Sequence, residues 1–415
     1  MRAHKVAVLV IFAVQGVIVG TWAPRVPAVA EHVHAGTGEL GLALLGASVG
    51  LIAAATVAGR LAARFGARRL VLISALLSAA VVPNLALVPT TPLLGLALVA
   101  LGASVGTLDV AMNIAAVTVV RLTERPLMPV FHAAYSFGAL FGAAGAAFAA
   151  GHHIGPLPHF TTVAGLAALV AIIIAAYIPN ERVLRHPAHQ RKGPSLARRP
   201  VLWLLASVAL CSAVAEGASA DWSALFAVRE RALTESAAAV IFAVFSISMA
   251  FARLAGERAE RRFGPYRMLV GGAVVAGGGL LVAVLVPQGW ASYVGFALAG
   301  AGLAYGFPVA LSLGGAAGRR PDGSGGEREL SFVTAIAYAG FLAGPPLVGG
   351  VAQLSNLAVA FGVVALVAAM IAPAALLAAA ARHREESRAR ILDREISSAS
   401  IGSSRARRQF GEEDG

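Results

Sequence analysis

The chain has 415 residues, of which 58% are hydrophobic and 13% carry a charged side chain, and its mean hydropathy is +0.77. Soluble globular proteins have about 25% charged residues, so this composition excludes a soluble globular domain and indicates a polytopic membrane protein. The formal net charge of +12 is dispersed over many short connections, which argues against a nucleic-acid-binding protein.

Twelve apolar segments follow one another along the chain. Each is long enough to cross the hydrocarbon core of a bilayer, which takes about 20 residues of α-helix. In chain order the predicted spans cover residues 6–23, 38–58, 70–88, 93–119, 128–150, 160–178, 201–226, 234–252, 268–286, 291–314, 330–351 and 357–381. The sequence therefore predicts an all-α membrane protein with 12 transmembrane helices.

Basic residues are concentrated in every second connection between these spans. Only three of the 33 Lys and Arg residues fall in the other set of connections, namely Arg25, Arg229 and Arg231. Because basic loops stay in the cytoplasm, we expect a multi-pass integral protein of the plasma (inner) membrane with both termini cytoplasmic.

The chain divides into two halves that repeat each other. We expect an N-terminal six-helix half at 1–178, a basic cytoplasmic linker at 179–200, a C-terminal six-helix half at 201–381, and a basic, partly disordered cytoplasmic tail at 382–415. Sparse landmarks recur 198 residues apart: Phe65-Gly66 as Phe263-Gly264, Arg69 as Arg267, and Val88-Pro89 as Val286-Pro287. Parallel repeats of this kind are a transporter architecture, with the substrate site near the midplane between the halves.

Glycine pairs recur in the fifth and eleventh spans, as Gly138-xxx-Gly142 and Gly340-xxx-Gly344. Small residues at this spacing let two helix backbones approach closely. We expect close helix packing to be their direct role.

The connection after the second span reads Gly59-Arg60-Leu61-Ala62-Ala63-Arg64-Phe65-Gly66-Ala67-Arg68-Arg69. It resembles the signature loop of the major facilitator superfamily, and Arg253-Leu254-Ala255-Gly256-Glu257-Arg258 with Phe263-Gly264 resembles its diverged second copy. The resemblance implies two pseudo-symmetric six-helix halves and a loop that gates the cytoplasmic face. The acidic residue of the family loop is replaced here by Ala63. The gating candidates that the resemblance implies are Gly59, Arg60, Gly66, Arg68, Arg253 and Glu257.

Further stretches are similar to the fucose-permease-like group of this superfamily and to its YbjJ-type branch. They are Trp22-Ala-Pro24-Arg25-Val-Pro27, Asp109-Val-Ala-Met-Asn113, His132-Ala-Ala-Tyr135-Ser136-Phe-Gly138, Glu216-Gly217-Ala-Ser-Ala-Asp221-Trp222 and Gly344-Pro345-Pro346. This resemblance implies proton-coupled import of a small polar or sugar-like solute. It also ties the acid at Asp109 to proton coupling.

Two acids lie deep inside predicted spans, Asp109 in the fourth and Glu216 in the seventh. A charged group at this depth is costly and is a functional candidate by default, so both are proton-coupling candidates. For Asp109 the alternative is a helix–helix hydrogen bond or an ion pair without a role in transport. The Gly, Ala and Ser residues after Glu216 suggest that this stretch unwinds toward a cavity.

Other polar side chains are candidates for the cavity or for an outer gate. We expect Arg25 to pair with Asp221 across the halves; the alternative for Arg25 is an interfacial side chain that reaches toward water. The substrate-cavity candidates are Gln15, Asn113, Ser136, Tyr305 and Tyr338.

No enzyme chemistry is predicted, because the chain has neither a phosphate-binding Gly-x-x-x-x-Gly-Lys-Ser/Thr loop nor a nucleophile–base–orienter set. The outer histidines His152, His153 and His159 have no Cys or acid beside them, so a solvated loop is favoured over a metal site. No cofactor is expected beyond a proton gradient as energy source. The expected partners are a small-molecule substrate and the lipid bilayer, without nucleic acid, and the protein is expected to be a monomer.

The sequence therefore predicts a proton-coupled secondary active transporter that works by alternating access, and the family resemblance implies import of a small polar or sugar-like solute. Two alternatives stay open. One is proton-antiport efflux of drugs or amphipathic metabolites. The other is a transport-inactive membrane sensor or scaffold.

Overall fold

The computed structural model describes residues 2–125, 127–179, 196–319 and 325–410. Within these ranges, 12 helical segments are long and apolar enough to cross a membrane. The predicted fold class, an all-α membrane protein with 12 spans, is thereby confirmed. Most of the predicted linker, with Arg182, Arg185, Arg191 and Lys192, lies outside the described residues, as do the last five residues of the tail.

The N-terminal half supplies the first six spans. The first span is bent at a short 3₁₀ helix, where Pro24 and Pro27 each lack the N–H that would continue the helical hydrogen-bond ladder. The elements are α1 (Arg2–Trp22), η1 (Ala23–Arg25), α2 (Val26–His32), α3 (Thr37–Phe65), α4 (Ala67–Asn84), α5 (Thr91–Thr123), α6 (Met128–Gly151) and α7 (Pro156–Ala175).

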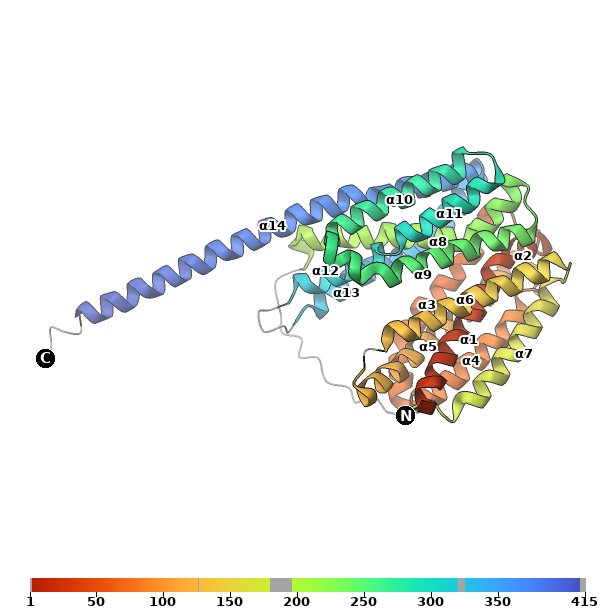
Figure 1. Ribbon diagram of the computed structural model, residues 1–415, viewed down its shortest axis with the longest axis horizontal. Coiled ribbons are helices and arrows are strands. Elements are labelled where there is room, and N and C mark those ends of the chain that lie inside the picture. The colour runs from red at the N-terminus through yellow and green to blue at the C-terminus, as the bar shows by residue number, and fades with distance from the viewer. Residues whose placement is uncertain (1, 126, 180–195, 320–324, 411–415) are drawn as a thin grey trace.

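The C-terminal half supplies the other six, and its tenth span is divided into two helices. The elements are η2 (Leu196–Arg198), α8 (Pro200–Arg231), α9 (Glu235–Phe263), α10 (Pro265–Leu285), α11 (Gly289–Leu303), α12 (Gly306–Ala317), α13 (Glu327–Leu354) and α14 (Leu357–Phe410). Beyond the bundle α14 continues as one helix (Figure 1), supported early in the tail by an Arg382–Glu386 pair one turn apart. The expected partial disorder of the distal tail stays a prediction.

The two halves use the same internal packing. Helix α6 packs along α1 as α13 packs along α8, α3 packs on α5 as α9 packs on α11, and α4 packs on α7 as α10 packs on α14. The repeated glycine pairs lie at these contacts: a Cβ at Gly138 would overlap the α1 backbone at Ala13, and one at Gly340 would press on α8 at Leu210. Close packing as the role of these glycines is thus supported in both halves.

The halves meet at one end of the bundle, which we call the sealed end and define by Arg25, Gly41, Glu235 and Gly349. Here α3 packs on α13 and α6 packs on α9. Toward the other end, the basic end, where α3 and α9 finish at Phe65 and Phe263, the helices of the two halves diverge (Figure 1). The inner faces of the bundle are therefore closed off at the sealed end.

Candidate functional site

Asp109 lies near the middle of α5 and is nevertheless exposed. Its Oδ1 accepts a hydrogen bond from Asn113 Nδ2 at 3.3 Å, and the same amide donates to the Asp109 backbone carbonyl at 2.9 Å. The carboxylate also interacts electrostatically with His132 of α6 and lies beside the side chain of Gln15 of α1. Three helices of the N-terminal half thus contribute polar groups to one acid.

The C-terminal half places an ion pair at a similar depth. Arg253 Nη2 lies 3.0 Å from Glu216 Oε1, and the side chains are 46% and 23% exposed, respectively. The predicted eighth span ends at residue 252, which puts Arg253 in a gating loop. The loop placement is wrong, because α9 continues to Phe263 and holds Arg253 within the helix.

The break in the tenth span lies directly against Arg253. Helix α11 ends at Leu303 and α12 begins at Gly306. Pro308 has no N–H to donate to the carbonyl of Ala304, four residues earlier, and Arg253 Nε donates to this carbonyl instead at 3.3 Å. The Tyr305 hydroxyl donates to the carbonyl of Ala252 at 2.6 Å. Two hydrogen bonds therefore hold the broken segment to α9, which is how non-helical backbone is tolerated at membrane depth.

The two sets of groups face each other across the halves. His132 interacts electrostatically with both Asp109 and Arg253. Tyr135 of α6 interacts with Asp109, Arg253 and Glu216, and Tyr338 of α13 interacts with Asp109. We call this set the central cluster; it comprises Gln15, Asp109, Asn113, His132, Tyr135, Glu216, Arg253 and Tyr338. It joins two carboxylates, one guanidinium and one imidazole between two halves of a membrane protein.

Of the predicted cavity residues, Gln15, Asn113 and Tyr338 belong to the central cluster, whereas Ser136 and Tyr305 do not. Ser136 donates to the His132 carbonyl at 3.2 Å and lies one turn from that residue. Tyr305 holds the carbonyl of Ala252, next to Arg253, through its hydroxyl, and its side chain lines a groove with Arg267 and Met268. His132 and Tyr135 are not among the predicted cavity residues, although the spacing of His132 from Ser136 puts both on one helix face.

Arg25 is 2% exposed and joins the two halves at the sealed end. Its Nη1 lies 3.2 Å from Glu235 Oε2 of α9, and its Nη2 donates to the carbonyl of Ile154 at 2.7 Å. The prediction that Arg25 pairs with Asp221 is therefore wrong. Within the described parts of the chain, Asp221 has no hydrogen bond or ion pair. The expected unwinding after Glu216 is also wrong, because α8 is continuous from Pro200 to Arg231.

The gating candidates at the basic end have local contacts. Arg68 Nε donates to the carbonyl of Ile178 at 2.7 Å, which ties α4 to the end of α7. Glu257 pairs with Arg261 on the surface of α9 at 3.0 Å, while Gly59 and Arg60 are exposed on α3. As far as the structure describes the chain, none of these residues pairs with the opposite half. Their gating role stays a prediction.

Gly66 and Gly264 end α3 and α9 and begin the next helix with nearly the same backbone. Their φ and ψ angles are 83° and 150° for Gly66 and 78° and 158° for Gly264. Side chains other than glycine rarely adopt this region. The recurrence at an offset of 198 residues thus reflects one turn used twice.

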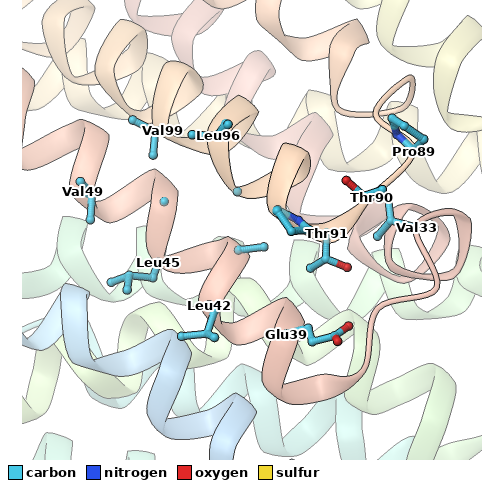
Figure 2. Close-up of a pocket in the computed structure, with 14 residues that line it drawn as sticks. Val33, Glu39, Leu42, Leu45, Val49, Pro89, Thr90, Thr91, Leu96 and Val99 are labelled. Atoms are coloured by element: carbon cyan, nitrogen blue, oxygen red, sulfur yellow. The ribbon is translucent and has the colours of Figure 1, made fainter.

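A groove of about 620 Å³ lies between α3 and α5 near the sealed end, far from these charges. Figure 2 shows Leu42, Leu45 and Val49 on one side and Leu96 and Val99 on the other, with Glu39 near the start of α3. Leu42 and Leu96 are 65% and 66% exposed. On a transmembrane helix such apolar exposure indicates a lipid-facing surface, so we assign this groove to the bilayer.

Comparisons with known proteins agree with this architecture. Residues 7–325 match the family described as "Major Facilitator Superfamily". An uncharacterized MFS-type transporter of Yersinia pestis is 33% identical over 90% of this chain and 95% of its own length. Among solved structures, the nucleoside transporter NupG has a TM-score of 0.72 at 13% identity, covering 91% of this chain and 99% of that one. FucP in its outward conformation has a TM-score of 0.61 at 18% identity, covering 90% and 98%. The chain belongs to the Major Facilitator Superfamily and is a secondary transporter, not an enzyme.

Proposed function

We propose that the protein imports a small polar, sugar-like solute together with protons, and that Asp109 and Glu216 carry those protons. The observation that supports this most directly is the central cluster. Two carboxylates at mid-depth, between the halves, are costly to maintain. Such groups at the interface of two repeats are typical of substrate and coupling sites in secondary transporters.

The coupling follows from the loss of water during closure. In the described state the Asp109 side chain is exposed, so water can reach its carboxylate. If the basic end closed, the carboxylate would lose this water, and the charged form would become much more costly. A bound proton removes that cost, so protonation favours the occluded state and deprotonation favours the state open at the basic end.

Direction and orientation rest on the charges of the connections. The excess of Arg at the basic end favours a cytoplasmic location for it, so that the described state would release solute into the cell. A fold neighbour, FucP of E. coli, is described as a fucose:proton symporter. At 17% identity it shares the fold, and its substrate type is consistent with the proposed polar solute.

Proton movement in proteoliposomes tests this proposal. Vesicles loaded with a pH-sensitive dye would be challenged with sugars, sugar acids, nucleosides and amphipathic drugs. We expect at least one polar solute to move protons in its own direction, and Asp109→Asn and Glu216→Gln to reduce that flux at least tenfold. Glu39→Gln, an acid variant outside the cluster, should keep it. Solute uptake without protons, or wild-type flux in both cluster variants, would contradict the proposal, and protons moving opposite to the solute would indicate antiport.

A further inference from the structure

We infer, building on the proposed function, that the transported solute carries a carboxylate, and that this carboxylate binds Arg253 in exchange for a Glu216 that has taken up a proton. The site consists of Arg253, Glu216 and the break in the tenth span. The co-transported proton would then reside on Glu216 while the solute anion is bound.

Arg253 has donor capacity left over. Its Nε donates to Ala304 and its Nη2 to Glu216, whereas its Nη1 donates to no residue that the structure describes. The side chain is 46% exposed, so this nitrogen is open to a solute in the described state. A planar guanidinium with neighbouring free and exchangeable donors matches a carboxylate, which it can bind through two parallel hydrogen bonds.

The helix break adds a second feature that favours an anion. Helix α12 begins at Gly306 inside the membrane, and the N-terminal end of a helix carries partial positive charge. Ser212 of α8, one turn before Glu216, is fully buried against Gly306, and its hydroxyl has no hydrogen-bond partner among the described residues. Half-helix ends at the midplane are where secondary transporters bind anionic groups.

The exchange follows from charge balance. A guanidinium at this depth needs an anion, and in the described state Glu216 provides it. A solute carboxylate that approached Arg253 would meet a second negative charge on Glu216, and two close carboxylates cannot both stay ionised at low cost. A proton on Glu216 removes this repulsion. Solute anion and proton therefore bind together, and the net charge of the site stays the same.

Other ionisable groups face this site from the elements around it. Arg253 lies on α9, Asp109 on α5 and Tyr338 on α13, and His132 and Tyr135 lie on α6. Asp109 has its own partners in Asn113 and His132, so it does not replace Glu216 as the counter-ion of Arg253. The proton that accompanies the solute anion is thus assigned to Glu216.

Matched pairs of acids and neutral analogues test this inference. Binding to the purified full-length protein would be measured by thermal stabilisation at pH 5.5 and 8 with galacturonate against galactose, gluconate against sorbitol, and lactate against lactamide. We expect at least one acid to bind at least tenfold more tightly than its neutral analogue, and more tightly at pH 5.5. Neutral analogues that bind as well as the acids, or a panel in which no acid binds, would overturn the inference.

Variants separate a direct role from a structural one. Glu216→Gln mimics the protonated acid, so it should bind the acid at pH 8 as tightly as the wild type does at pH 5.5. Arg253→Gln should abolish acid binding, and the double variant Arg253→Gln/Glu216→Gln, which leaves no unpaired charge, should fold and still not bind. Arg261→Gln on the surface of α9 is the control. Acid binding that survives Arg253→Gln would overturn the inference.

The outcomes also separate this inference from the proposed function. Proton-coupled transport of a neutral solute that persists in Arg253→Gln would overturn the inference and leave proton coupling intact. Acid binding that depends on Arg253, without any proton movement in vesicles, would instead contradict the proposed coupling.

Discussion

At the scale of single residues, one glycine in each half determines how two consecutive helices connect. Gly66 and Gly264 have φ angles of 83° and 78° with extended ψ. A Cβ at Gly264 would meet no atom within 4 Å, so backbone conformation alone decides what a substitution costs there.

We therefore expect Gly264→Ala to lower the free energy of unfolding by about 1–3 kcal/mol, the usual cost of this backbone region for other residues. Gly59→Ala is the matched control. Gly59 lies inside α3, and a Cβ there also meets nothing within 4 Å, so the change should be neutral or stabilise by up to about 1 kcal/mol. Denaturant unfolding in detergent measures both. Equal effects of the two substitutions would contradict the backbone argument.

Part of the central cluster can be predicted from the sequence, because an isolated polar residue inside an apolar span stands out. Asp109, Asn113 and Glu216 are predicted in this way. Arg253 is instead predicted in the connection, since it begins the charged stretch that follows an apolar run. Its position in the site depends on α9 continuing past that run and on a partner in the neighbouring helix α8. Neither fact is visible in local hydropathy.

At the scale of elements, the break in the tenth span shows why glycine and proline differ as helix breakers. Gly217 and the small residues after it predict unwinding, yet α8 is continuous there, because glycine keeps its N–H and the hydrogen-bond ladder can continue. Pro308 removes the donor that Ala304 would use, and α11 and α12 separate at that point. A missing donor does not always interrupt a helix, since α13 continues through Pro345 and Pro346. Composition therefore predicts twelve spans but not which of them is interrupted.

Pro308→Ala should restore that donor and let α11 and α12 join. The Ala304 carbonyl would then be satisfied within the helix, and Arg253 would lose one of its acceptors. We expect stability to stay constant or rise by about 1 kcal/mol, the net value of one hydrogen bond, while transport falls at least tenfold. Pro373→Ala in α14, a proline inside an unbroken helix, should leave transport unchanged. Unaltered transport in Pro308→Ala would show that the break does not matter for function.

At the scale of the whole molecule, the structure is one state of a transporter with two alternately opened ends. Besides the Arg25–Glu235 pair, small residues close the sealed end: a Cβ at Gly41 or at Gly349 would press on the opposite half. Ser236 of α9 donates to the Ala147 carbonyl of α6 at 2.9 Å. In a transporter that opens its two ends alternately, switching states requires these contacts to separate. The order of spans and their pseudo-symmetry follow from sequence, but the state does not, because both states use the same helices.

The Arg25–Glu235 pair should bias this equilibrium strongly, because Arg25 is 2% exposed. Glu235→Gln leaves the buried guanidinium without its anion. Because the Glu235 side chain is 34% exposed, we expect a cost below the roughly 3–5 kcal/mol of a fully buried ion pair. That cost falls on the state closed at the sealed end, and it shifts the population ratio toward the other state about tenfold for every 1.4 kcal/mol. In nanodiscs, a Ser236→Cys reporter in a Cys211→Ala background should therefore react with a bulky maleimide at least tenfold faster when Glu235→Gln is present. The double variant Arg25→Gln/Glu235→Gln leaves no unpaired charge and should react at an intermediate rate. Glu39→Gln is the control, since Glu39 lies at the same end of the bundle but has no partner in the other half among the described residues. It should react like the reporter alone. If it accelerated labelling as much as Glu235→Gln, the effect would come from loss of any acid at this end and not from the pair across the halves.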